Sequence, residues 1–98
     1  MTREPMRGSE VDAAVASLPG WDVVDGKLHR LFQFVDFRAA LAFMNAVGDA
    51  AETANHHPEW FNVYNRVEVW MTTHDAGGIT IKDFDLARVM NSLASKLS

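Results

Sequence analysis

The stretch WDVVDGKLHRLFQF, residues 21–34, decides the fold because it places a tight-turn signal between two strand-like runs. The turn signal is Asp25-Gly26, a dipeptide suited to a type I′ turn with positive φ at both positions. The runs on either side are Trp21–Val24 and Lys27–Phe34. The stretch therefore predicts a β-hairpin. In its second strand Leu28 and Leu31 point to opposite faces, so we expect both faces to be partly covered.

A short helix is predicted before this hairpin. Ser9 can cap it, and apolar residues follow at helical spacing at Val11, Ala14, Val15 and Leu18. Pro19-Gly20 ends it. Residues 1–8 are polar and lack periodicity, so we expect a disordered lead-in and a single domain over residues 9–98.

A long helix is predicted after the hairpin. Asp36 is a natural N-cap, and the helix should end near Asn55. Its apolar residues at intervals of three and four are Phe37, Ala40, Leu41, Met44, Val47 and Ala51. Phe43 and Ala50 fall outside this stripe, so we expect them to widen the apolar surface and to offer a contact beyond the domain's own core.

The last third of the chain predicts two more strands and a helix. Strand-like runs cover Phe61–Tyr64 and Val67–Thr73, with a break at Asn65-Arg66. Thr80 and Asp83 fit a capping box that opens the final helix. The order α-β-β-α-β-β-α with tight connections predicts an α+β fold, a four-stranded antiparallel sheet with three helices packed on one face.

Composition limits the classes of function. With 98 residues, 48% of them hydrophobic and 22% charged, the chain has the profile of one compact domain. A formal charge of −4 and scattered Lys and Arg argue against binding nucleic acid. The chain has no cysteine, which excludes disulfides and thiolate zinc sites. We find no apolar run long enough for a signal peptide or a membrane span, so we expect a cytoplasmic protein.

The candidate functional residues gather in NHHPEWF, residues 55–61, with a further histidine at position 74. Imidazole titrates near neutral pH, so His56, His57 and His74 suggest proton transfer or metal binding. Pro58 biases His57 toward extended geometry, in which neighbouring side chains point to opposite faces. We therefore expect the two adjacent imidazoles to play different parts, with at most one facing a ligand squarely.

A set of motif residues resembles the signature of the pterin-4a-carbinolamine dehydratases, also called 4a-hydroxytetrahydrobiopterin dehydratases. The motif residues are Glu52, His56-His57-Pro58, Tyr64, His74 and Asp83, together with the run Pro58–Asn65 and the pair Thr73-His74. The resemblance covers roughly residues 9 to 95. It implies dehydration of the 4a-hydroxytetrahydropterin left by aromatic amino acid hydroxylases, giving quinonoid dihydropterin and water, with no metal or organic cofactor.

The resemblance also implies which residues form the site. His56, His57 and His74 would be catalytic, and Asn55, Thr72 and Thr73 would line the pterin site. The sequence departs from some relatives in having Asn55 in place of a carboxylate, and from others in having Asp75 in place of glutamate.

The chemistry of the residues suggests a division of roles. Expelling hydroxide from a carbinolamine needs an acid for the leaving oxygen and a base for a ring proton, and imidazole can be either. We assign proton transfer to His56 and His74 and pterin binding to His57. Glu52, one turn before His56, is assigned to the substrate side of the site, where it could orient an imidazole. Structural roles are assigned to Asp83, Pro58 and Tyr64.

Two other functions fit the same residues. Three histidines can hold a catalytic zinc, which would make the protein a metal-dependent hydrolase. The divergence of adjacent side chains argues against that interpretation. The second alternative is a dimerising binding module that stabilises a partner protein through its wide apolar helix, as some relatives of the family do. We expect a homodimer or homotetramer, with an aromatic amino acid hydroxylase as a candidate partner.

Overall fold

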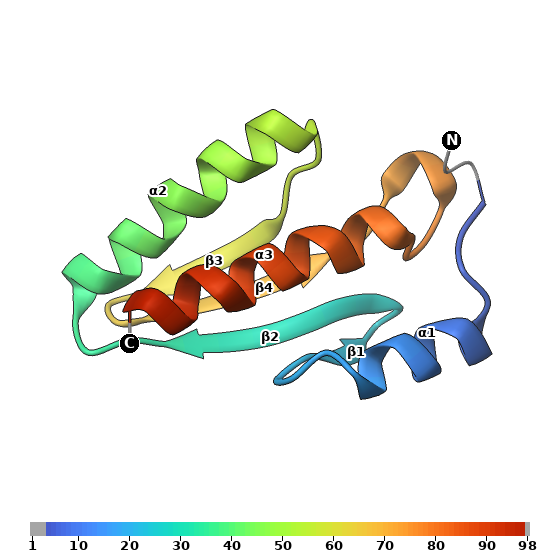
Figure 1. The fold of residues 1–98 in the computed structure, drawn as a ribbon, viewed down its shortest axis with the longest axis horizontal. Helices are drawn as coiled ribbons and strands as arrows, with labels where there is room; N and C mark the ends of the chain where they lie inside the picture. The colour runs from blue at the N-terminus through green and yellow to red at the C-terminus, as the bar shows by residue number, and fades with distance from the viewer. Residues whose placement is uncertain (1–3, 98) are drawn as a thin grey trace.

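The computed structural model describes residues 4–97, and its helices and strands follow the predicted order (Figure 1). The elements are α1 (Gly8–Ala16), β1 (Asp22–Val24), β2 (Lys27–Gln33), α2 (Phe37–Ala54), β3 (Glu59–Val63), β4 (Arg66–Met71), the short 3-10 helix η1 (His74–Ala76) and α3 (Ile81–Leu97). All strand pairs are antiparallel, in the order β1-β2-β4-β3. The predicted α+β fold, with three helices and a four-stranded antiparallel sheet, is confirmed.

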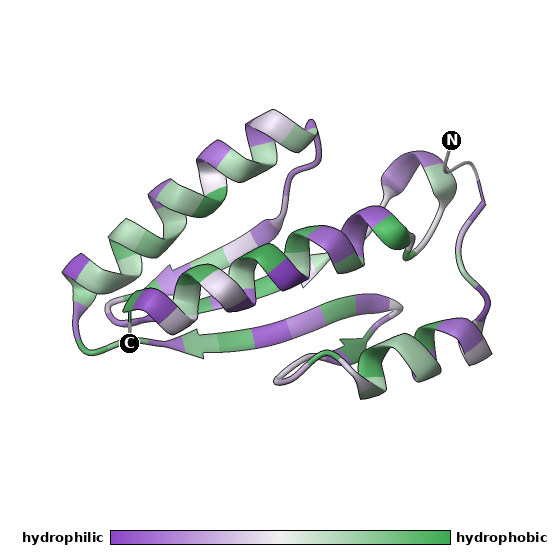
Figure 2. Cartoon of the chain, in the orientation of Figure 1, coloured by the Kyte–Doolittle hydropathy of each residue, from purple (hydrophilic) through white to green (hydrophobic). Residues whose placement is uncertain are grey.

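The core lies between the sheet and the two long helices. Figure 1 shows α2 and α3 running across the same face of the sheet, while α1 lies beside β1. Leu28 and Phe32 of β2 and Val67, Val69 and Met71 of β4 point into this layer and are at most 2% exposed. Polar and apolar residues alternate along α3, as expected for a helix with one buried side (Figure 2).

The apolar stripe of α2 differs from the prediction. Phe43 is fully buried, whereas Phe37 and Leu41 are exposed. The Phe43 ring packs against Phe32 and Phe34, with ring centroids 4.7 and 5.0 Å away. Burying such a ring contributes about 1.5–3 kcal/mol, so contact with the hairpin decides which side of the helix faces the core. The expectation that Phe43 serves an outside contact is therefore wrong.

Local signals set most of the element boundaries. Asp25 and Gly26 have φ of 52° and 75°, as the predicted type I′ turn requires. The Asp36 side chain accepts from the backbone N–H of Ala39, which confirms it as the N-cap of α2. The break between β3 and β4 falls one residue earlier than predicted, because Tyr64 takes a positive φ of 49° and Arg66 already pairs with Val63.

The first helix begins at Gly8, before the predicted cap at Ser9. The Glu10 side chain accepts from the backbone N–H of Arg7 at 2.8 Å, which starts the first turn earlier. Met6 donates its backbone N–H to Ile79 O at 2.8 Å and packs against the core. Met6 and Arg7 of the predicted disordered lead-in thus carry defined contacts and Gly8 opens α1, while residues 1–3 lie outside the described residues. Between residues 4 and 97 no helix has the length and apolarity needed to cross a membrane.

Candidate active site

Most of the residues predicted for the site line one pocket. The pocket lies where the segment after α2, the end of β4 and the start of α3 meet. Its lining residues are Asn55, His56, His57, Thr72, Thr73, His74, Asp75 and Lys82. Both adjacent histidines are among them, and the expectation that at most one of the two imidazoles faces a ligand squarely stays a prediction.

The end of α2 places the histidine pair. Asn55 takes a left-handed conformation with φ 52° and ψ 44°, which ends the helix. The backbone N–H of His56 then donates to Ala51 O at 3.0 Å, fixing the direction in which the chain leaves. Pro58 follows and β3 begins at Glu59, so the two imidazoles sit on a short segment held at both ends. The structural role of Pro58 stays a prediction.

His56 faces a buried carboxylate. Its Nε2 lies 2.6 Å from Asp83 Oδ1, and the two side chains are 10% and 0% exposed. Asp83 Oδ2 accepts from Thr73 Oγ1 at 2.8 Å and from the backbone N–H of Thr80 at 2.9 Å. The second of these bonds is one half of the predicted capping box, while Thr80 Oγ1 accepts from the backbone N–H of Lys82 at 3.2 Å. A carboxylate that accepts all of these bonds favours the His56 tautomer with its proton on Nε2. Nδ1 is then the nitrogen left to exchange a proton.

His57 and Glu52 form a second pair of this kind. His57 Nε2 lies 2.5 Å from Glu52 Oε2, and both side chains are mostly exposed. The sequence predicts that Glu52, one turn before His56, could orient an imidazole. The structure places it against the imidazole of His57, because the left-handed Asn55 turns the chain back over the last turn of α2.

His74 completes the set. It begins η1, just beyond β4, and its side chain is 79% exposed. Its Nε2 lies 3.3 Å from Glu59 Oε2, while Glu59 Oε1 accepts from Lys27 Nζ at 2.7 Å. The hydrogen bond from Lys27 is the main cause that lowers the pKa of Glu59, and His74 adds to it. Each of the three imidazoles thus has a carboxylate beside its Nε2.

Tyr64 and His29 are not among the residues that line the histidine pocket. Tyr64 lies in the turn after β3, at the opposite end of that strand from Glu59, and lines another hollow with Phe37 and Leu41. It is remote from the histidines, and its predicted structural role stays a prediction. His29 bridges Asp22 and Glu68 at 2.9 and 2.8 Å, as expected for a histidine satisfied within the fold.

Sequence reasoning missed Lys82 and the roles of Glu59 and Lys27. Lys82 is the second residue of α3, and no motif spacing marks it. The sequence held a signal for Glu59. This residue opens an extended run close to His57, and a side chain there projects beside the residues that follow the neighbouring strand. Its partner Lys27 comes from β2, far away in the sequence.

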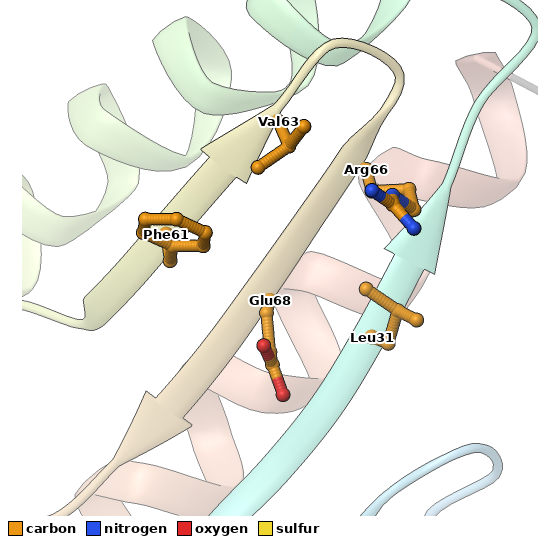
Figure 3. A pocket seen from close by; sticks show the side chains of 5 residues that line it. All are labelled: Leu31, Phe61, Val63, Arg66 and Glu68. Atoms are coloured by element: carbon orange, nitrogen blue, oxygen red, sulfur yellow. The ribbon is translucent and has the colours of Figure 1, made fainter.

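The outer face of the sheet carries a second hollow, shown in Figure 3. Leu31 of β2, Phe61 and Val63 of β3, and Arg66 and Glu68 of β4 project from the same side of the sheet and line it. Its surface is apolar with one cation and one carboxylate. The groups able to transfer protons near neutral pH gather at the histidine pocket instead.

Among residues 4–97, no three His, Cys, Asp or Glu side chains come together in a group that could hold a metal ion. Each imidazole Nε2 faces a carboxylate at hydrogen-bonding or ion-pair distance. Fold and pocket together define a small α+β domain whose candidate site gathers three histidines, each with a carboxylate beside its Nε2.

Comparison with known proteins identifies the family. A family model described as "Pterin 4 alpha carbinolamine dehydratase" matches residues 4–93, and the chain belongs to this family of hydro-lyases.

Close relatives and a solved structure agree with that assignment. A protein from Solibacter usitatus is 54% identical over 87 residues, covering 89% of this chain and 92% of its own. One from Rhodopseudomonas palustris strain BisB18 is 53% identical over 88 residues, covering 88% and 87%. Both are named among the pterin-4-alpha-carbinolamine dehydratases. The crystal structure of a "transcriptional coactivator/pterin dehydratase" from Brucella melitensis matches with a TM-score of 0.90 and 44% identity, over 93% of this chain and 99% of that one.

Proposed function

We propose that this protein dehydrates 4a-hydroxytetrahydropterin to quinonoid dihydropterin and water by histidine acid–base catalysis, in the recycling of tetrahydrobiopterin. The observation that carries the proposal is the pocket in which three imidazoles meet, each with a carboxylate beside its Nε2. Family membership supplies the substrate class.

The reaction needs two proton transfers that balance. The C4a–O bond breaks as an acid protonates the leaving hydroxyl, and a base removes a proton from a ring nitrogen, so water leaves and a C=N bond forms. We assign these steps to His56 and His74, and binding of the pterin to His57. Positioned acids and bases each contribute on the order of 10²–10⁴-fold.

The environments of the two proton-transfer residues suit different tasks. His56 is nearly buried and its Nε2 is committed to Asp83, so its ring is rigid and only Nδ1 is available. His74 is exposed and can exchange protons with water between turnovers. The side chains of Asn55, Thr72 and Thr73 offer an amide and two hydroxyls as hydrogen-bonding groups for the pterin ring. We assign Glu52 an indirect part, through His57.

A chelation experiment separates this proposal from the zinc-hydrolase alternative. Purified protein is assayed on freshly generated 4a-hydroxytetrahydropterin before and after treatment with a chelator, alongside the His57→Ala variant. Metal-free catalysis predicts an unchanged rate after chelation and a weaker apparent affinity in His57→Ala. Loss of activity on metal removal, with recovery on adding zinc, would contradict the proposal.

A binding role is the second candidate, and it also bears on the expected homodimer or homotetramer. β3 is an edge strand with exposed Phe61 and Val63, and Tyr64 is exposed in the turn that follows it. The helix α2 exposes Phe37 and Leu41. The Brucella melitensis relative is named both as a transcriptional coactivator and as a pterin dehydratase. We infer self-association through these surfaces, which sedimentation at several protein concentrations tests. A hydroxylase partner and a cytoplasmic location stay predictions of the sequence.

A further inference from the structure

We propose that Glu59 is a positioning residue that orients His74 and sets its protonation, and that Lys27 holds Glu59 in place for this task. The inference rests on the proposed function, because it assigns His74 a part in proton transfer. Family membership and the sequence motifs assign no role to either residue.

The sheet brings the three residues together from separate elements. Glu59 begins β3 and Lys27 begins β2, and β4 runs between these two strands. Glu59 is opposite Trp70 in the register of β3 and β4, and Trp70 is also opposite His29 of β2. The ion pair of Lys27 and Glu59 therefore reaches across β4 near its end, just before the chain enters the pocket.

The two oxygens of Glu59 are divided between two partners. Oε1 accepts from Lys27 Nζ at 2.7 Å, and Oε2 lies 3.3 Å from Nε2 of His74. The Lys27 hydrogen bond lowers the pKa of Glu59, so the carboxylate is ionised at neutral pH and can only accept. Such a group beside Nε2 favours the tautomer that carries its proton there.

His74 needs this support more than His56 does. The His56 side chain is 10% exposed, so packing limits its ring, whereas the His74 side chain is 79% exposed on a three-residue helix. An exposed ring on a short turn has many orientations open to it. The contact with Glu59 is what selects the one in which His74 faces the pocket.

A purely structural role predicts a different outcome. Lys27 and Glu59 are 34% and 40% exposed, and exposed ion pairs contribute little to stability. If the pair only joined two strands, removing it would leave the pH dependence of the reaction unchanged. Protonation of His74 is therefore the readout that separates the two roles.

The test compares Glu59→Gln, Lys27→Met and a matched control, Glu68→Gln. Glu68 also pairs with an imidazole, that of His29, but outside the pocket. The pH profile of kcat/KM is measured for each variant, and the limb due to His74 is identified by its loss in His74→Ala. Titration of the His74 ring by NMR in the same variants gives a second readout that needs no activity.

Both variants should impair His74, Glu59→Gln the more strongly. Glu59→Gln removes the negative charge beside Nε2, so the His74 limb and the ring titration move to lower pH, and kcat/KM falls about tenfold. Lys27→Met removes the partner that holds Glu59 against His74, so kcat/KM falls by less than in Glu59→Gln. Glu59→Asp should recover part of the lost rate, and Glu68→Gln should leave the His74 titration unchanged.

The outcomes distinguish this inference from the proposed function. Wild-type protein without dehydratase activity would refute the proposed function, and the NMR titration would still decide the role of Glu59. Active wild-type protein whose His74 titration and pH profile are the same in Glu59→Gln would overturn the inference alone.

Discussion

Replacing Asp83 with asparagine tests how the buried carboxylate serves both the fold and His56. In the wild-type protein three donors converge on its two oxygens, from His56 Nε2, Thr73 Oγ1 and the backbone N–H of Thr80, at 2.6, 2.8 and 2.9 Å. Asparagine keeps the shape but has one acceptor oxygen. If that oxygen serves the two threonines, the amide NH₂ faces His56 Nε2, where one donor opposes another.

The structure sets the expected magnitudes. One hydrogen bond to a charged acceptor is lost, worth about 1.5–3 kcal/mol. At roughly 4–8 °C per kcal/mol for a domain of this size, the melting temperature should fall by about 6–24 °C. To accept from the amide, Nε2 of His56 must give up its proton and Nδ1 must carry it. Nδ1, the nitrogen left for proton transfer, then becomes a donor instead of an acceptor. Turnover per folded molecule should fall on the order of 10²-fold.

The assay combines thermal unfolding followed by circular dichroism with dehydratase rates taken well below both melting temperatures. Asp36→Ala is the matched control, because it removes the N-cap of α2 away from the pocket. Its loss should cost about 0.5–2 kcal/mol of stability and leave turnover per folded molecule unchanged. A folded Asp83→Asn protein with wild-type turnover would refute the reasoning that Asp83 fixes the His56 tautomer.

Three further predictions concern the histidines and the hairpin. In an alanine double-mutant cycle, the rate losses from removing His56 and His74 should be strongly non-additive. Each single variant should keep some rate, and the double variant should lie near background with a flat pH profile. Two additive losses would contradict a shared role. Burial alone lowers the pKa of His29, but hydrogen bonds to Glu68 and Asp22 outweigh it and raise the pKa above 6.5. Its stabilisation is therefore complete below about pH 6.5 and lost as pH rises through the folded pKa, and urea unfolding of His29→Gln across this window should show a flatter pH dependence than the wild type. Gly26→Val, at φ 75°, should lower the free energy of unfolding by about 1–2 kcal/mol, and an unchanged urea midpoint would show that the turn tolerates a side chain.

Local signals in the sequence were sufficient for most of the fold. The Asp25-Gly26 turn, the Asp36 cap and the Thr80–Asp83 box each act within four residues, so their geometry can be read without tertiary structure. The side of α2 that faces the core could not be read this way. Phe43 and Phe37 are both apolar, and only the ring packing of Phe43 against β2 and the residues after it selects between them.

The same difference between local and tertiary information applies to the candidate site. The histidines and the threonines after β4 were found from their chemistry and from the family resemblance, and the structure brings them into one pocket. The carboxylate partners depend on distances between separate elements. Asp83 reaches His56 from α3, and Glu59 joins His74 to Lys27 across β4, contacts that no sequence spacing specifies.

The central claim is that the imidazoles around this pocket dehydrate a pterin carbinolamine. The most direct measurement follows formation of quinonoid dihydropterin from freshly generated 4a-hydroxytetrahydropterin, with and without catalytic amounts of the purified protein. The account predicts formation well above the spontaneous rate, falling close to that rate in the variant that lacks both His56 and His74. A folded wild-type protein that leaves the spontaneous rate unchanged, or a double variant as fast as the wild type, would contradict it.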